Sequence, residues 1–440
     1  MPELEKAFVC LPRMENAQGA GIRSQQVSME GYLWGVGMNT EPLELEMAVR
    51  LLREHVKRMT ETEEVVLEKA DRRVLAEDIC AERDQPPFPR SPLDGYALRS
   101  EDIRGADREH PVELRVLTEV DAGHCAELEV TPGTAVRIMT GAPIPEGADA
   151  VLRQEDSDYG EDTVLVYHSL RPWQNYCFQG EDYKAGSCLM KAGLQLHAVE
   201  IGILSGLGRK TVRVYRKPRL LLMSTGDELA EPGTPLRKGQ IYDSNLHMLC
   251  AQCRIWDVDI AGRKLVQDHA EEAAEYLREN VGQADLILTT GGVSVGKKDI
   301  MHEVYRLLGV ERIFWKVRIK PGMPTLAGMY EGREIISLSG NPYGAAANMN
   351  LLVKPVLEKM TGRRELGTEY REAVLENGYP KKSPTRRFVR AFYADGKVRI
   401  AQGSNDSGIL SNMAGCNCMV EFPSGSQEAE AGDQVRVCML

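Results

Sequence analysis

Three stretches of the sequence decide the fold: RLLLMSTG at residues 219–226, ADLILTTGG at 284–292 and REIISLSG at 333–340. Each is a short, continuous apolar run that opens into a glycine-containing loop, which is typical of a buried strand in a parallel sheet. Two further strands are predicted at 258–266 (VDIAGRKLV) and 313–319 (IFWKVRI). The sequence therefore predicts a central sheet in the second half of the chain.

Helices are predicted between these strands. NLHMLCAQCRI starts near Ser244, and AANMNLLVKPVLEKM covers residues 346–360. DHAEEAAEYLRENV at 268–281 begins with Asp268, which can cap the helix, and acidic residues fill its first turn. Strands that alternate with helices predict a doubly wound, mostly parallel α/β sheet. Ligands bind such sheets beyond the carboxyl ends of their strands.

Regions of different character flank this α/β segment. EPLELEMAVRLLREHVKRM at 41–59 is an amphipathic helix, and residues 1–42 before it lack a clear period. Short β segments separated by Gly, Pro and Asp turns fill residues 111–180, and turn-separated β segments also follow Gly362. These patterns predict β-rich modules on both sides of the α/β domain.

Composition limits the possible functions. The 440 residues are 42% hydrophobic and 27% charged, as in a soluble multidomain protein, and the net charge of −11 argues against a general nucleic-acid binder. No segment has the apolar length of a membrane span or the pattern of a signal peptide, so we expect a cytoplasmic protein. The pairs Cys250/Cys253 and Cys416/Cys418 lack matching partner pairs, which favours ordinary reduced cysteines over a zinc site.

Three loops follow the predicted strands: residues 224–228 (STGDE), 290–296 (TGGVSVG) and 339–342 (SGNP). Glycine-rich loops let backbone N–H groups approach an anion closely. Any one of them could equally be a tight strand-to-helix turn. Three at the same sheet edge favour a phosphate or nucleotide site.

A basic stretch at 315–320 (WKVRIK) adds to this edge. Its period of two places Lys316, Arg318 and Lys320 on one face and the apolar residues on the other. A solvated basic face on an edge strand is the alternative reading. However, the turn PGMP follows beside the glycine loops, where cations could bind phosphate or molybdate, both tetrahedral oxyanions.

Carboxylates form the opposite set. Those that follow or flank the loops are Asp227, Glu228, Asp243 and Asp299, and Asp94 and Asp182 lie in turn-rich segments upstream. Carboxylates beside a phosphate site commonly hold Mg²⁺, a hard cation that prefers oxygen ligands. Turn and cap chemistry is the alternative for any single one.

These segments together resemble the molybdopterin molybdotransferases, the MoeA family, which includes the gephyrin E domain. The motifs that carry the resemblance, in family order, are PPFPRSPLDGYALR (86–99), VRIMTGAPIPEGADAVLRQED (136–156), GEDYKAG (180–186), STGDEL (224–229), GQIYDSN (239–245), TGGVSVGKKD (290–299), WKVRIKPGMP (315–324) and SGNPYGA (339–345). Residues 1–42 lie outside the resemblance. Met323 and Ser339 depart from it, because many members have Lys and Pro there.

The resemblance implies an enzyme that inserts molybdate into adenylylated molybdopterin, uses Mg²⁺ and releases AMP. It also implies a homodimer with composite active sites, and the pathway's adenylyltransferase as a possible partner. With the sequence pattern it divides the chain into an extension (1–42), a linker and dimerisation domain (43–90 with 181–216), an inserted β-rich domain (91–180), an α/β molybdopterin-binding domain (217–363) and a C-terminal β domain (364–440).

The implied site residues fall into three groups. The expected catalytic residues are Asp94, Thr140, Asp182, Lys316 and Lys320. The expected pterin- or phosphate-binding residues are Thr225, Gly226, Gly291, Gly292, Ser294, Asn341 and Pro342. The expected metal ligands are Glu228, Asp243 and Asp299. An adenylyltransferase acting one step earlier shares the α/β domain, and a gephyrin-like scaffold would bind a peptide without turnover; the upstream motifs and the intact polar set argue against these two alternatives.

Overall fold

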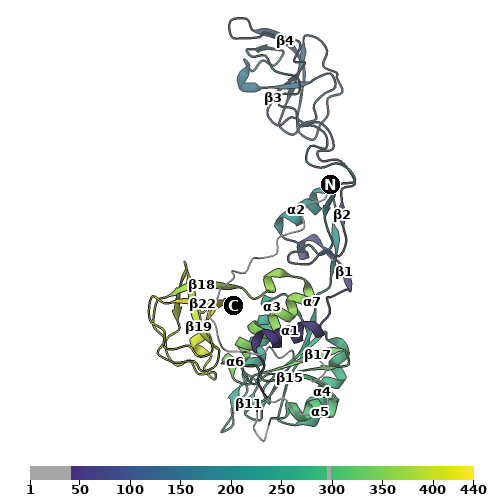
Figure 1. The fold of residues 1–440 in the computed structure, drawn as a ribbon. Helices are drawn as coiled ribbons and strands as arrows, with labels where there is room; N and C mark the ends of the chain where they lie inside the picture. Colours follow the sequence, from purple (N-terminus) through teal and green to yellow (C-terminus); the bar gives the residue numbers. More distant parts are fainter. Residues whose placement is uncertain (1–40, 295–298) are drawn as a thin grey trace, which may run out of the picture. The chain divides into compact units, whose positions relative to one another are not determined.

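The computed structural model describes residues 41–294 and 299–440, so most of the expected N-terminal extension lies outside the described residues. Residues 42–440 contain a six-stranded sheet, a five-stranded sheet and a closed five-stranded barrel, with three two-stranded ribbons (Figure 1).

The six-stranded sheet has the order β13-β10-β14-β17-β16-β15. Its strands are β10 (Arg219–Thr225), β13 (Asp259–Val266), β14 (Leu286–Thr290), β15 (Glu311–Trp315), β16 (Leu326–Tyr330) and β17 (Arg333–Leu338). The first four in this order pair in parallel, and β16 is antiparallel to both of its neighbours. The mostly parallel α/β sheet is thereby confirmed. The sequence pattern missed β16, a five-residue strand close to prolines and a glycine turn.

The strand predicted at 313–319 is too long. It ends at Trp315, because Lys316 adopts a left-handed backbone conformation with φ of 73°. Val317 and Ile319 are fully buried beyond this break, as the alternation predicted. Trp315 is not buried with them: its half-exposed ring lies beneath the Lys316 ammonium, 3.9 Å from the ring centroid.

The helices of the α/β domain are α3 (Asn245–Ile255), α4 (Ala270–Asn280), α5 (Met301–Leu308), α6 (Pro342–Asn348) and α7 (Lys354–Thr361), with a π-helical turn at Met349–Val353. The start of α3 after Ser244 is confirmed. The predicted Asp268 cap is wrong, since α4 begins after His269. Asp268 instead exchanges backbone-to-carboxylate hydrogen bonds with Asp227, at 3.1 and 3.3 Å. The sequence pattern also missed α5.

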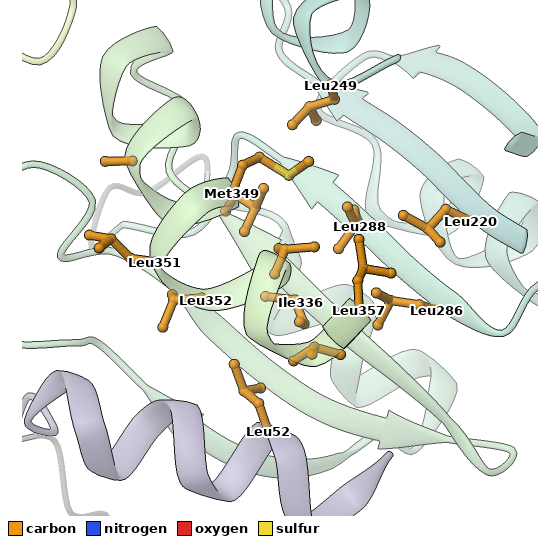
Figure 2. Close-up of a cluster of buried hydrophobic side chains, with 14 of the residues drawn as sticks. Leu52, Leu220, Leu249, Leu286, Leu288, Ile336, Met349, Leu351, Leu352 and Leu357 are labelled. Atoms are coloured by element: carbon orange, nitrogen blue, oxygen red, sulfur yellow. The ribbon is translucent and has the colours of Figure 1, made fainter. Parts of the chain in front are cut away.

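The largest core lies between this sheet and its helices. Leu52 of α1 (Leu45–His55), Leu286 and Ile336 of the sheet, and Leu357 of α7 all belong to it and are fully buried (Figure 2). The amphipathic helix predicted after Glu41 is therefore confirmed. Burial of this apolar face holds α1 on the α/β domain.

Two ribbons precede the sheet. Strand β1 (Thr62–Val66) pairs with β9 (Thr211–Tyr215), and β2 (Ile79–Cys80) pairs with β8 (Cys188–Met190). Helix α2 (Ala198–Gly206) lies between β8 and β9 in the sequence. The chain therefore leaves and re-enters this region through β2 and β8.

The segment between β2 and β8 contains the five-stranded sheet, in the order β6-β3-β5-β4-β7. Its strands are β3 (Gly95–Leu98), β4 (Val112–Val120), β5 (Thr134–Ile138), β6 (Ala150–Arg153) and β7 (Thr163–Val166). Four of them match predicted β segments. The sequence pattern missed β3, because its four residues follow the turn-rich run PPFPRSPLD.

The C-terminal region is a closed barrel in the order β18-β20-β19-β21-β22. Its strands are β18 (Tyr370–Leu375), β19 (Arg387–Ala394), β20 (Lys397–Ile400), β21 (Cys418–Phe422) and β22 (Gln434–Met439). Phe388, Met419 and Cys438 of the barrel extend the main core of the α/β domain. The barrel is thereby anchored beside the loops that follow the sheet.

Candidate functional site

The three predicted loops meet at the carboxyl edge of the six-stranded sheet. Gly291 has φ of 96°, and a Cβ atom there would lie 2.3 Å from the carbonyl oxygen of Thr225. A Cβ on Gly340 would lie 3.2 Å from the Cα of Gly291. Only glycine fits at 291, since both the conformation and the contact exclude a side chain. The structure thus confirms that the three loops share one edge.

Several buried polar atoms at this edge have no hydrogen-bond partner within residues 41–294 and 299–440. They are Ser224 Oγ, Thr225 Oγ1, Asp243 Oδ2 and Asn245 Oδ1. Asn245 is held by its amide nitrogen, which donates to Thr290 Oγ1 (3.0 Å) and to the Gly340 carbonyl (2.8 Å). Native proteins satisfy most buried polar atoms, so a group of unsatisfied ones at a loop cluster indicates a place for a polar ligand. The sequence had not singled out Asn245 as a ligand-binding residue.

Two acidic residues of this edge flank a short parallel ladder. Strand β11 (Leu229–Ala230) pairs in parallel with β12 (Ile241–Tyr242), so Glu228, which precedes β11, and Asp243, which follows β12, lie at opposite ends of this ladder. Asp243 is 3% exposed, and its Oδ1 accepts a bond from the Leu246 amide at 3.1 Å. Glu228 is exposed, and its carboxylate lies over Gly226, where a Cβ would be 2.9 Å from Oε2.

The oxygen donors at this edge can be compared with those that Mg²⁺, the predicted metal ion, requires. Among residues 41–294 and 299–440, no three His, Cys, Asp or Glu side chains form a preassembled cage. Mg²⁺ seldom uses such a cage, because it keeps several waters and binds one or two carboxylates together with substrate phosphates. The buried Oδ2 of Asp243, which has no hydrogen-bond partner among the described residues, fits that mode of binding as a single carboxylate ligand.

Two predicted cations lie at the same edge. Trp315 Nε1 donates to the Val293 carbonyl (3.2 Å), which places the ring and the overlying Lys316 ammonium against the 291–294 loop. Lys320 is exposed, and its backbone pairs with the barrel through bonds to Arg386 and Phe388 (2.9 and 2.8 Å).

Asn348, which the sequence analysis did not name, connects two of these loops. Its side chain is fully buried, and its Nδ2 donates to the Gly322 carbonyl at 3.0 Å. Its Oδ1 accepts from the Ser339 amide at 3.3 Å. Asn348 therefore fixes the turn after Lys320 against the 339–342 loop. Ser339, one of the two family departures, contributes only its backbone to this contact.

The barrel also contributes residues that the sequence gave no reason to expect. A small cavity is lined by Lys320, Pro321, Arg387, Phe388, Val389, Asn405 and Ser407. Ser407 Oγ accepts from Asn341 Nδ2 at 3.0 Å, and its carbonyl accepts from the Tyr343 amide. Arg387 and Ser407 follow Lys320 by more than 60 residues, so only tertiary packing brings them to the predicted loops.

The upstream predictions lie in a different part of the fold. Asp94 Oδ1 accepts hydrogen bonds from the Thr140 hydroxyl (2.6 Å) and the Thr140 amide (2.7 Å). The Thr140 hydroxyl, followed by its amide, lowers the pKa of Asp94 below its ordinary value. Asp182 is exposed, and its amide donates to the Gln85 carbonyl at 2.9 Å. The predicted catalytic residues thus form one set at the six-stranded sheet and a second set around β3, β5 and residue 182.

Comparison with known proteins agrees with this architecture. Three family models match: "MoeA N-terminal region (domain I and II)" over residues 43–208, "Probable molybdopterin binding domain" over 221–359 and "MoeA C-terminal region (domain IV)" over 372–440. A molybdopterin molybdenumtransferase of Staphylococcus epidermidis is 34% identical over 402 residues, which cover 90% of this chain and 96% of the relative. One from Staphylococcus aureus is 34% identical over 378 residues, which cover 85% and 90%.

Solved structures give the same result. A crystal structure of a molybdopterin biosynthesis moeA protein from Pyrococcus horikoshii OT3 is 32% identical, with a TM-score of 0.77 over 91% of this chain and all of that one. A second structure of a moeA protein from this archaeon has 30% identity and a TM-score of 0.79, over 91% and 99%. The matches extend over the α/β domain, both flanking regions and the barrel. The chain belongs to the MoeA family.

Proposed function

We propose that this protein is a molybdopterin molybdotransferase, which inserts molybdate into adenylylated molybdopterin and releases AMP in molybdenum cofactor biosynthesis. The observation that carries the proposal is the sheet edge where three loops converge on buried, unpaired Thr225 Oγ1, Asp243 Oδ2 and Asn245 Oδ1, beside Lys316 and Lys320. The curated relatives that share the chain's full architecture are named for this activity.

The glycine loops are suited to bind the pterin and its phosphates. The Gly291 N–H donates to the Leu338 carbonyl at 3.4 Å, so the Gly292 N–H is the backbone donor that we assign to an anion in this loop. Thr225, Gly226 and Ser294 lie on the same rim. Asn341 and Pro342 open α6, and the helix dipole favours negative charge at this end.

Molybdate is the second substrate. Lys320 lies on the rim of the small cavity, and its exposed side chain can give a tetrahedral oxyanion a charge-assisted hydrogen bond. The Lys316 ammonium, which lies over the Trp315 ring, supplies a second positive charge near the loops. Charge-assisted bonds of this kind stabilise an oxyanion more strongly than neutral ones.

We further propose that Mg²⁺ binds at this edge through Asp243, with Glu228 and Asp299 as additional oxygen donors. When bound, the ion would neutralise charge on the pyrophosphate linkage of the adenylylated pterin. Asp243 is the strongest candidate ligand, because its buried Oδ2 has no hydrogen-bond partner among the residues that the structure describes.

Asp94 is assigned to proton transfer or to positioning of a water molecule. The two bonds from Thr140 keep its carboxylate ionised, as a proton acceptor requires. Asp182 is the second candidate for this role. Because Asp94 and Asp182 lie outside the six-stranded sheet, we propose a homodimer in which each active site combines residues of two subunits. We propose that this homodimer is cytoplasmic. The pathway's adenylyltransferase, which supplies the substrate, is a possible partner.

Incubation with adenylylated molybdopterin, Mg²⁺ and molybdate tests the proposal. Release of AMP together with molybdenum in the product supports it. Loss of metal-dependent AMP release in Glu228→Ala and Asp299→Ala would support the metal ligands, and wild-type rates in both would reject them. Pyrophosphate formed from molybdopterin and ATP would identify an adenylyltransferase, and peptide binding without turnover would identify a scaffold.

A further inference from the structure

A pair of cysteines lies outside the proposed site, in the ribbon of β2 and β8. Cys80 is paired with Cys188 in this antiparallel ladder, next to a register shift between Ile79 and Cys80. Residues 81–187, which include the whole five-stranded sheet, connect the two strands. The pair therefore lies where the chain enters and leaves that sheet's segment.

The geometry of the pair suits a disulfide. Directly opposed residues in antiparallel strands have Cα atoms about 4.5 or 5.5 Å apart, within the range of roughly 4.4–6.8 Å that disulfides span. Both side chains are exposed, so an oxidant can reach them. The two thiols are in hydrogen-bonding contact, and this contact, followed by desolvation, raises the pKa of Cys80.

A lysine accompanies the pair. The ammonium of Lys191 contacts the Cys188 thiol and pairs with the Asp78 carboxylate at 2.7 Å. Reactive thiols are found in partly exposed sites near a positive charge, whereas structural cysteines are buried and inert. The buried Cys250 and Cys253 of α3 are such an inert pair, since burial raises the pKa of Cys253 to about 12.

We propose that Cys80 and Cys188 form a redox-active dithiol that a low-molecular-weight disulfide oxidises. The Cys188 thiolate attacks glutathione disulfide, forms a mixed disulfide and releases one glutathione thiolate. The Cys80 thiolate then attacks the Cys188 sulfur and releases the second glutathione. The protein loses two electrons and two protons, and glutathione disulfide is reduced to two glutathione molecules.

The disulfide would fasten the two strands of the ribbon to each other. Residues 81–187 would then form a covalently closed loop that includes the five-stranded sheet. The inference does not depend on the proposed transferase activity, because it rests only on the pairing and exposure of the two thiols.

Equilibration of the full chain in glutathione buffers of increasing oxidation tests the proposal. After the remaining thiols are blocked, mass spectrometry of proteolytic fragments should show one cross-linked species that joins the Cys80 and Cys188 peptides. Cys250 and Cys253 should remain fully alkylatable after unfolding. Cys125, exposed but without a partner thiol among the described residues, should give only a mixed disulfide with glutathione.

Single variants complete the test. In Cys80→Ser, Cys188 should retain glutathione instead of passing the disulfide on, and the cross-link should be absent. Dithiothreitol should remove the cross-link from the wild-type chain. Independent glutathionylation of Cys80 and Cys188 in the wild-type chain, or cross-linking no greater than that of the buried Cys250/Cys253 pair, would overturn the proposal.

Discussion

The two sets of candidate catalytic residues differ in how well their polar atoms are satisfied. At the edge of the six-stranded sheet, Thr225, Asp243 and Asn245 each have a buried atom with no hydrogen-bond partner in the part of the chain that the structure describes. In the five-stranded sheet, Asp94 accepts two bonds from Thr140 and lies near the surface. The unpaired atoms of the first set destabilise the unliganded fold, and a bound ligand can offset this by forming hydrogen bonds to them. The Asp94 carboxylate of the second set has hydrogen bonds without a ligand.

This difference suggests different roles for the two sets: the first binds substrate or metal, and the second transfers a proton. Unpaired buried atoms raise the free energy of the unliganded fold and lower that of the complex, so they belong where substrate or metal binds. A satisfied carboxylate with a lowered pKa is prepared for proton transfer without help from a ligand. If one reaction needs both sets, variants of each should be complementary.

The largest expected effect is therefore subunit complementation. Asp94→Asn and Lys320→Ala should each abolish turnover as homodimers. Unfolded, mixed and refolded together, they should form mixed dimers in which one composite site carries both lesions and the other carries neither. Random pairing makes half of the dimers mixed, so about a quarter of wild-type activity should return by two-fold subunit statistics.

The matched control mixes Lys320→Ala with Asp243→Asn, both in the α/β domain. Each composite site of the mixed dimer then carries one lesion, so mixing should give no more activity than the average of the two unmixed variants. If the Asp94 and Lys320 variants also fail to complement while mixed dimers are present, the two sets do not form a site shared between subunits.

Asp243→Asn probes the unpaired set alone. Loss of its charge should lower AMP release by roughly 10–150-fold, since a charge-assisted interaction contributes about 1.5–3 kcal/mol. Chemical denaturation of the unliganded protein should show no loss of free energy of unfolding, because Oδ2 has no partner to lose. A destabilised variant would mean that Asp243 serves the fold rather than a ligand.

The same contrast explains what the sequence could predict. Continuous apolar runs located β10, β14 and β17 and the loops after them, because burial on both faces leaves a clear pattern. Short β3 and β16 gave no such pattern. Asn348, Arg387 and Ser407 reach the site through tertiary contacts, and Asp268 pairs with Asp227 instead of capping α4. Such contacts depend on packing between distant segments, which local periodicity does not encode.

A second buried carboxylate sharpens the comparison within the α/β domain. Glu334, the second residue of β17, lies near the end of this strand opposite the loops and is 1% exposed. Neither of its carboxylate oxygens has a hydrogen-bond partner among the described residues. Burial raises its pKa well above the ordinary value, so the folded chain keeps a proton that the unfolded chain releases. Stability from this group is complete below the unfolded pKa and is lost as pH rises through the folded pKa.

Glu334→Met should therefore raise the free energy of unfolding near pH 7 by about 1–3 kcal/mol, because it removes an unsatisfied buried group. The free energy of unfolding of this variant, measured by urea denaturation between pH 4 and pH 8, should depend less on pH than that of the wild type. AMP release should be unchanged, in contrast to Asp243→Asn. An equally steep loss of stability with rising pH would show that Glu334 does not hold its proton in the fold.

The smallest expected effect concerns the satisfied set. Thr140→Val removes the hydroxyl that contributes most to the lowered pKa of Asp94, and it leaves the amide bond at 2.7 Å in place. The pKa of Asp94 should rise toward its ordinary value. Because the ionised carboxylate is the active form in the proposed mechanism, the acidic limb of the kcat/KM profile should move to higher pH. Thr140→Ser retains a hydroxyl and should keep the wild-type profile, which separates the hydrogen bond from side-chain packing. Identical profiles for the Val and Ser variants would show that the Thr140 hydroxyl does not control the ionisation of Asp94 in turnover.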